Sequence, residues 1–361
     1  MLRMSRIKRL ALGGMAFVLG GCSPGYVIQA AYNQSKILLG RRQIEKVISD
    51  PETDPTDRSK LKLVLEARAF AATIGLTPGG SFTAYTDIGK DTLAWVVVAS
   101  RKDSFSLYTW WFPIVGTVPY KGFFSEADAI AQAKELEADG YESSVRGTEA
   151  FSTLGWFNDP VLSTTLKNPP VRIANTVLHE SVHATVWIPG NVAFNESLAN
   201  FVGGQATLEF YRAQQQECHR AHAECAAADT LVAAAERDLA FQLEFGDTVT
   251  RLVDALEGLY GSQALSREQK LERRERVFQE AVAPFRKHYP ATSVLKTVNN
   301  AEIIQYKLYL TKLRLFEKLF VQSHGSWSVF FEKIREVQRA MHDDGTRDPF
   351  VVLNDLVETT G

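Results

Sequence analysis

The chain has 361 residues, of which 45% are hydrophobic and 23% are charged, and its formal net charge is −2. This is the composition of a folded globular protein with enough chain for a sizeable core, in one large domain or in two. A net charge this close to zero gives no electrostatic footprint for nucleic acid, so we expect no nucleic-acid partner.

Residues 1–21 are predicted to be a lipoprotein signal peptide. Basic residues precede a short apolar run at 10–19, which is too short to span a bilayer comfortably. The run ends in Leu19-Gly20-Gly21-Cys22, which resembles a bacterial lipobox. We therefore expect cleavage before Cys22 and lipid attachment to it. A plain signal peptide or an uncleaved anchor is the alternative. Ser23, by analogy with enteric lipoproteins, favours the outer membrane, with the protein facing the periplasm.

The mature chain is predicted to begin with a helical hairpin, over residues 22–76. Apolar residues recur at helical spacing in 37–48 and in 61–74, and a Pro- and Asp-containing turn at 50–55 separates the two segments. No low-complexity linker is visible, so we expect the hairpin to pack on the body of the protein.

Residues 77–205 are predicted to form the α+β catalytic core. The segments 93–99 and 105–118 are rich in β-branched and aromatic residues, and the polar stretch between them suggests a hairpin. A helix should then follow over 126–138, because Ser125 can cap its start and Gly140 can end it. Residues 141–146 alternate in polarity and predict another strand.

The strongest chemical signal is His179-Glu180-x-x-His183, which lies in a predicted helix over 171–187. Two imidazoles four residues apart lie on one helix face and can hold a single metal ion. Glu180 is placed to hold a water molecule and to act as a general base, which is the zinc-hydrolase pattern. The plainer alternative is a pair of satisfied core histidines.

A third metal ligand is expected on the next helix, which returns antiparallel. Glu196 follows His183 by thirteen residues. Two histidines and one carboxylate leave a fourth position for water, as in a catalytic zinc site. Alternatively, Glu196 is an ordinary first-turn glutamate favoured by the helix dipole. Asn195 and Asn200 could orient its carboxylate through hydrogen bonds, and Asn195 could equally be a helix cap.

Residues just before the metal helix are expected to line the substrate cleft, as a wall or as an edge strand that pairs with a peptide. These residues are Ser152, Thr153, Leu154, Gly155, Trp156 and Phe157. For Trp156 and Phe157, packing in the core is an equal alternative.

The histidine motif followed by Asn195-Glu196-x-x-Ala199 resembles the gluzincin metallopeptidases. Together with phrases at 118–124, 152–160 and 298–301, it is similar to a bacterial family of predicted zinc aminopeptidases, many of them lipoproteins. The similarity covers residues 26–340. It implies a zincin-like fold with a small antiparallel sheet beside the metal helix. The implied site has one Zn²⁺ on His179, His183 and Glu196, with Glu180 as base. The chain lacks the Gly-Ala-Met-Glu-Asn segment that reads a free amino terminus in well-studied gluzincin aminopeptidases.

Residues 206–290 are predicted to form a long helical hairpin, whose charge run at 267–276 is a solvated face. Cys218 and Cys225 would lie about 10 Å apart on a continuous helix, too far for a disulfide. Either the helix breaks and the cysteines bridge, or they stay free. A structural metal site that includes His222 is a weaker alternative.

Residues 291–361 are predicted to be helices packed on the core, with one helical stretch over 299–340. Peptidases of this kind often use a tyrosine or histidine to stabilise the oxyanion. Tyr309 and Tyr306 are the candidates here, and Tyr309 is preferred because it lies near the Asn-Asn-Ala segment shared with the resembled family. Core packing is the alternative for both.

The sequence therefore predicts an α+β, mostly helical zinc peptidase, lipid-anchored in the bacterial envelope and acting on peptides or proteins. Two alternatives stay open. One is an envelope lipoprotein with a chaperone-like or assembly role that keeps a metal site. The other is an endopeptidase of envelope quality control. The intact Glu180 argues against the non-catalytic alternative, because a site without turnover has no need for a base.

Overall fold

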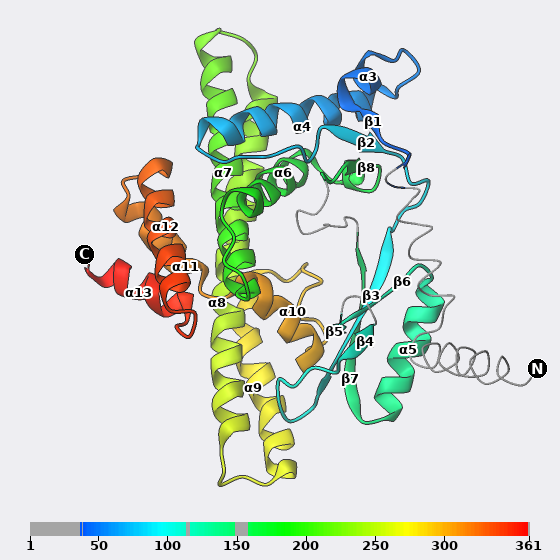
Figure 1. The fold of residues 1–361 in the computed structure, drawn as a ribbon, viewed down its shortest axis with the longest axis vertical. Helices are drawn as coiled ribbons and strands as arrows, with labels where there is room; N and C mark the ends of the chain where they lie inside the picture. Colours follow the sequence, from blue (N-terminus) through cyan, green and yellow to red (C-terminus); the bar gives the residue numbers. More distant parts are fainter. Residues whose placement is uncertain (1–36, 38, 113–115, 149–157, 360–361) are drawn as a thin grey trace, which may run out of the picture.

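The computed structural model describes residues 37, 39–112, 116–148 and 158–359. The predicted lipidation site Cys22 and the predicted cleft residues 152–157 lie outside the described residues. The described part is mostly helical with small sheets, as an α+β protein should be (Figure 1). No helix of this part is both long enough and apolar enough to cross a bilayer.

Helix formation near the amino terminus follows its local signals. Helix α4 (Pro55–Thr73) begins at Asp54, whose side chain accepts hydrogen bonds from the backbone of Thr56 and Asp57. A shorter helix, α3 (Ile44–Ser49), precedes it, and the predicted turn separates the two. A three-stranded sheet lies beside them, in the order β1-β2-β8. Its strands are β1 (Arg42–Gln43), β2 (Ala84–Thr86) and β8 (Val161–Leu162).

The larger sheet is centred on β3 (Ala94–Arg101). This strand is antiparallel to both β6 (Lys121–Phe123) and β7 (Tyr141–Thr148), in the order β6-β3-β7. The predicted hairpin between 93–99 and 105–118 forms only at its turn, where Tyr108 donates a backbone hydrogen bond to Ala99 and Arg101 donates one to Ser106. A bridge joins Ser100 to Leu107, but the chain then leaves the sheet. It forms a separate pair, β4 (Trp110–Phe112) with β5 (Gly116–Val118).

Helices cover the two faces of this sheet. Val97 and Ala99 of β3 pack against α5 (Glu126–Ala138), which has the bounds predicted from its cap residues. Helix α10 (Asn300–Leu310) contacts both β3 and β7, and in Figure 1 it lies between the sheet and the long helix α8 (Ala226–Gly261). The sheet is thus sandwiched between α5 and the helical body.

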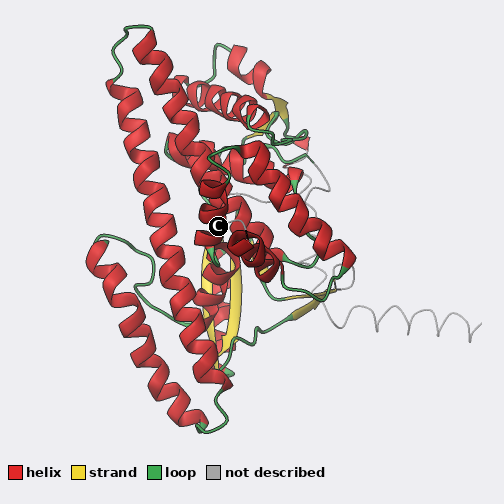
Figure 2. Cartoon of the chain, turned by 90° about the vertical axis from the view of Figure 1, so that its left-hand side faces the viewer, coloured by secondary structure: helices red, strands yellow, loops and turns green. Residues whose placement is uncertain are grey.

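The helical body is built around three long helices, of which the longest packs against both of the others (Figure 2). They are α7 (Val192–Arg220), α8 and α9 (Arg267–His288). The remaining helices of the body are α6 (Pro170–Thr185), α11 (Leu313–Gln322), α12 (Trp327–Asp343) and α13 (Pro349–Thr359), and a 3-10 turn, η1 (Thr165–Lys167), precedes α6. Helix α7 runs unbroken through the predicted domain boundary at 205–206. The predicted domain division stays a prediction.

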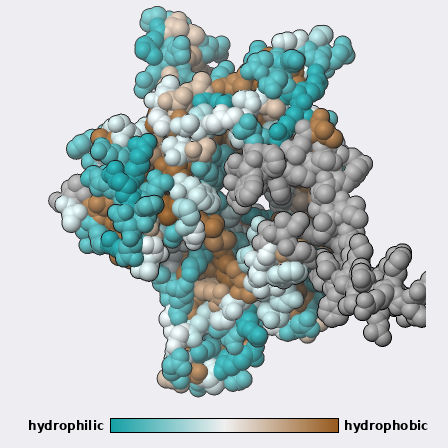
Figure 3. Space-filling model, viewed as in Figure 1, coloured by the Kyte–Doolittle hydropathy of each residue, from teal (hydrophilic) through white to brown (hydrophobic). Residues whose placement is uncertain are grey.

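The main core lies among these helices and is rich in phenylalanine. The Phe316 ring of α11 lies 5.3 Å from that of Phe194 and 6.3 Å from that of Phe201, both on α7. Phe350 of α13 also contacts Phe194, with ring centroids 5.2 Å apart. These aromatic contacts anchor the carboxyl-terminal helices to α7. In Figure 3 hydrophobic residues show mainly along the middle of the face, where the helices meet.

The backbone breaks two of the predicted helical stretches. The expected helical stretch over 299–340 is interrupted, because Lys312 takes a left-handed φ of 53° and Gly325 one of 71°. The long hairpin also breaks where the sequence left the choice open. Helix α7 ends at Arg220, His222 takes a φ of 50°, and Cys218 and Cys225 form a disulfide with Cα atoms 5.9 Å apart.

Candidate metal centre

The candidate site lies where α6 crosses α7. Pro170 opens α6 at a position that needs no backbone donor, and buried apolar residues repeat along one side of the helix. Gly203 of α7 lets the two helices approach closely. A Cβ atom there would lie 3.2 Å from the His179 Cβ and 3.4 Å from the Asn175 carbonyl oxygen. The crossing brings the start of α7 against the last two turns of α6.

Three side chains converge at this crossing. The Nε2 atoms of His179 and His183 lie 3.2 Å apart. The Glu196 Oε2 atom lies 3.3 Å from the first and 3.5 Å from the second. All three side chains are only 13–17% exposed. Among the described residues, they form a group whose ligand atoms all lie within 4.8 Å of one another, so they could hold one metal ion.

His179 and Glu196 of this cluster shift each other's pKa values. Burial alone would lower the pKa of His179, but its hydrogen bond to Glu196 and the charges of Glu180 and Glu196 outweigh burial and raise that pKa. Burial likewise opposes ionisation of Glu196. The hydrogen bonds and charges of both histidines outweigh burial and lower the pKa of Glu196 to about 2. Without metal, the carboxylate is therefore ionised and paired with imidazole.

The donor set fits the ion implied by the sequence. Two imidazole nitrogens and one carboxylate oxygen are borderline to hard ligands, and three protein ligands leave a coordination position open. The same set also accepts other divalent transition metals. Glu180 is half-buried beside His179 on α6, and its charge reaches both His179 and Tyr309. A carboxylate that is not one of the three converging ligands thus lies next to them.

The segment after α6 supports His183 in a way that the sequence did not predict. The Trp187 ring packs edge-on against the His183 ring, with centroids 5.5 Å apart. The side chain of Gln338 on α12 donates a 3.0 Å hydrogen bond to the Trp187 carbonyl. Among the described residues, the buried Nδ1 atom of His183 has no hydrogen-bond partner. Trp187 therefore holds this imidazole by ring packing.

The two predicted orienting asparagines act on the backbone instead. The Asn195 amide pairs with both the N–H and the carbonyl of Ile188, at 3.0 and 2.8 Å. The Asn200 amide donates to the Tyr309 carbonyl at 2.8 Å. None of these hydrogen bonds reaches the Glu196 carboxylate. Asn195 fixes the turn between the metal helices, and Asn200 ties α10 to α7.

Of the two candidate tyrosines, Tyr309 lies beside the site. Burial and the charges of Glu196 and Glu180 raise the pKa of its phenol, although the positive charge of Arg146 works in the opposite direction. The Tyr306 hydroxyl donates to Glu302 at 2.7 Å instead. Arg146 was missed at the sequence level, because an alternating strand gives no sign of which helix will cover it.

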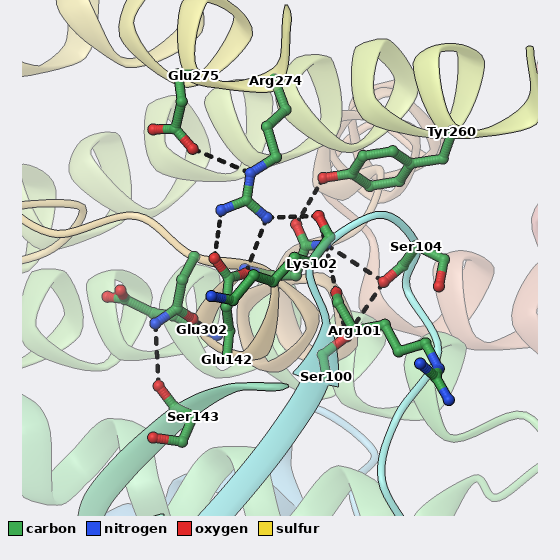
Figure 4. A network of polar contacts seen from close by, with 12 residues as sticks. Ser100, Arg101, Lys102, Ser104, Glu142, Ser143, Tyr260, Arg274, Glu275 and Glu302 are labelled. Atoms are coloured by element: carbon green, nitrogen blue, oxygen red, sulfur yellow. Dashed lines mark hydrogen bonds and ion pairs between the residues drawn. The ribbon is translucent and has the colours of Figure 1, made fainter. Parts of the chain in front are cut away.

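A polar network fixes the start of α10 on the sheet (Figure 4). Arg274 of α9 forms a bidentate ion pair with Glu142 of β7. Glu142 also accepts a 2.9 Å hydrogen bond from the Asn300 backbone. The Tyr260 hydroxyl donates to the Asn300 side chain at 2.9 Å. These contacts hold the helix that carries Tyr309.

The second possible metal site is not formed. Cys218 and Cys225 are joined as a disulfide, so neither sulfur offers a thiolate ligand. His219, next to Cys218, lies 3.3 Å from Asp229 on α8. This end of the α7–α8 hairpin is therefore held covalently rather than by a metal.

Comparison with known proteins gives one match. The model of a family described as "Putative aminopeptidase" matches residues 25–347, which is most of the chain. No curated protein and no solved structure matches the chain. The matched range includes α6, α7 and α10, the helices that carry the converging side chains and Tyr309.

Proposed function

The chain belongs to the family described as "Putative aminopeptidase", and from this premise we propose that it is a zinc-dependent peptidase that hydrolyses peptide bonds with Glu180 as its base. The observation that carries the proposal is the convergence of His179, His183 and Glu196 at the α6–α7 crossing, with Glu180 beside them. The aminopeptidase activity named by the family is one form of this chemistry.

The chemistry divides among a few groups. Zn²⁺ held by the three ligands would supply a Lewis acid and lower the pKa of a water molecule toward neutrality. The Glu180 carboxylate takes a proton from the attacking water and passes it to the leaving amine. The Glu196 carboxylate and the two imidazoles stay in place throughout, because α6 and α7 hold them from both sides of the crossing.

Tyr309 is proposed to stabilise the charge that develops on the carbonyl oxygen. Burial and the nearby carboxylates raise the pKa of its phenol, so the hydroxyl keeps its proton at neutral pH and can donate a hydrogen bond. The bond from Asn200 to the Tyr309 carbonyl fixes this helix next to the ligand helix. The protonated phenol and its nearness to both carboxylates support Tyr309 as the oxyanion donor.

We further propose that the protein acts at the bacterial envelope. The Leu19-Gly20-Gly21-Cys22 segment supports lipid attachment at Cys22, with the catalytic body in the periplasm. A pair of cysteines joined as a disulfide is in keeping with an oxidising compartment. Peptide or protein substrates would then come from the envelope.

The test is Glu180→Gln, which removes the base and leaves the ligands intact. We expect the zinc content to be unchanged while hydrolysis of a mixed peptide library falls by about 10²- to 10⁴-fold. Glu217→Gln, an exposed glutamate on α7, is the matched control and should retain full activity. Activity that survives Glu180→Gln would remove this residue from its role. Wild-type protein that binds zinc but cleaves nothing would favour the non-catalytic alternative.

A further inference from the structure

Strand alternation places Arg146 on the face of the sheet that α10 covers. Val145 packs toward α5, so residues of even number on β7 point the other way. Glu142 confirms this orientation, because its carboxylate contacts the Asn300 backbone at the start of α10. Arg146 lies four residues further along the same strand and is exposed.

Arg146 on β7 and Tyr309 on α10 lie at similar distances from one shared contact. From Asn300 to Tyr309, helix α10 rises by about 14 Å. From Glu142 to Arg146, strand β7 extends by about 13 Å. Both elements start at the Glu142–Asn300 contact and pack on each other, so Arg146 and Tyr309 lie at similar distances from that contact. The positive charge of Arg146 also reaches the Tyr309 phenol, where it works against the rise in pKa.

Arg146 consequently lies near Tyr309, beside the candidate metal centre. The Tyr309 carbonyl is bonded to Asn200, one helical turn beyond Glu196. Among the described residues, no carboxylate forms an ion pair with Arg146, and its guanidinium carries five donors. An exposed cation thus lies near Tyr309, whose phenol also feels the charges of Glu196 and Glu180.

The neighbouring carboxylates of the described residues already have partners or roles. Glu196 contacts both imidazoles, Glu180 is the proposed base, and Glu302 accepts from Tyr306. A substrate ammonium group placed beside Arg146 would meet a like charge. A carboxylate would instead gain a charge-assisted and potentially bidentate pair.

We propose that Arg146 is a specificity-determining residue that binds a carboxylate of the substrate close to the scissile bond. The substrates are then peptides that carry this group as a C-terminal carboxylate or as an acidic side chain. This inference rests on the proposed function and adds the substrate class. It also replaces recognition of a free amino terminus as the main source of specificity.

Binding can be tested without turnover, on zinc-loaded Glu180→Gln protein by calorimetry. Four forms of one short peptide distinguish a C-terminal carboxylate from an acidic side chain as the recognised group. The first is N-acetylated with a free C-terminal carboxylate, and the second is N-acetylated and C-amidated. The third is N-acetylated and C-amidated with an internal glutamate, and the fourth is C-amidated with a free amino terminus. We expect the carboxylate-bearing forms to bind best. Adding Arg146→Gln should weaken only these forms, by about ten- to hundredfold, the size of a charge-assisted hydrogen bond. Arg146→Lys should retain part of the affinity.

A matched control comes from the other face of the same sheet. Arg101 of β3 is also exposed, and its guanidinium lies 5.4 Å from the Tyr141 ring, on the α5 side. Arg101→Gln should leave the binding of all four peptides unchanged. The zinc content and melting temperature of each variant show that the fold and the metal centre survive.

Three outcomes would overturn the inference. The first is an equal loss for all four peptides in Arg146→Gln, which would mean that Arg146 acts only through Tyr309. The second is no loss for any peptide, and the third is tightest binding of the free-amine form. Failure of the proposed function looks different: wild-type protein would bind the carboxylate peptides through Arg146 and cleave none of them.

Discussion

At the scale of single residues, the candidate metal centre is a compact set of opposite charges. The raised pKa of His179 and the lowered pKa of Glu196 arise from the same contact. In metal-free protein the His179 shift stabilises the fold at low pH, and this stability is lost as pH rises through the raised pKa. The Glu196 shift stabilises the fold above pH 4.5, and this stability is lost as pH falls toward 2. The pair therefore holds the crossing together at intermediate pH.

Glu196→Gln tests whether this residue is a ligand or an ordinary first-turn glutamate. The amide keeps the shape of the side chain but is a far poorer metal ligand than a carboxylate. Loss of an outer partner of a ligand costs about 10- to 100-fold in metal affinity, and loss of a ligand should exceed that range. Zinc titration against a competing chelator measures the difference. An affinity equal to that of the Glu217→Gln control would show that Glu196 does not bind the metal.

At the scale of elements, the α6–α7 crossing depends on Gly203. A methyl group there would press on the His179 Cβ and the Asn175 carbonyl. Backbone and a Cβ atom cannot turn aside as a flexible side chain can, so the helices must separate. The Glu196 carboxylate would then move away from the two imidazoles on α6.

Gly203→Ala is therefore expected to destabilise the protein by about 1–3 kcal/mol, as overpacking does, and to weaken zinc binding. Gly258→Ala on α8 is the matched control, because a Cβ there meets nothing within 4 Å. It should stabilise the protein by about 0.5–1 kcal/mol through helix propensity alone. Urea unfolding and chelator competition report the two effects. Equal behaviour of the two alanine variants would rule out a steric role for Gly203.

Elements with local signals were predictable from sequence. Ser125 and Gly140 marked both ends of α5, and the helix predicted over 171–187 begins within one residue of the start of α6. The neighbours of β3 were not predictable, because strand pairing joins segments far apart in the chain. The helix break at Lys312 was also missed, since a lysine gives no signal for a left-handed backbone.

The same division holds for the site. The histidine pair could be placed in advance because a helix fixes the relation of residues four apart. The contact of Glu196 with the histidine pair depends on how α7 crosses α6, and no spacing within one helix fixes that crossing. Trp187, Gly203 and Arg146 carry no motif. Their surroundings arise only when α6, α7, α10 and β7 pack together.

At the scale of the whole molecule, Arg274 joins the sheet to the helical body. Its side chain is 8% exposed, and that of Glu142 is 12% exposed. Burial disfavours the Arg274 charge, but Glu142 outweighs burial and raises the pKa of the guanidinium. Arg274 also donates to the Lys102 carbonyl, at the turn that follows β3 (Figure 4). One side chain thus connects α9, β7 and the β3 turn.

Arg274→Met keeps the packing of the long side chain on Phe278 but leaves Glu142 buried without its ion-pair partner. Breaking a buried pair in this way costs about 3–5 kcal/mol. Arg276→Met, on an exposed side chain of the same helix, should change the stability by less than about 0.5 kcal/mol. Chemical denaturation compares the two variants. Similar midpoints would mean that the Arg274 network does not join the sheet to the body.

The placement of the ligands on two separate helices has a thermodynamic consequence. The unfolded chain holds no preformed site, so an ion bound at the crossing favours the folded ensemble by mass action. At a free ion concentration a hundred times the dissociation constant, this linkage adds about 2.7 kcal/mol to stability. If the site takes the proposed zinc, the metal supply of the compartment sets the population of intact protein as well as its activity.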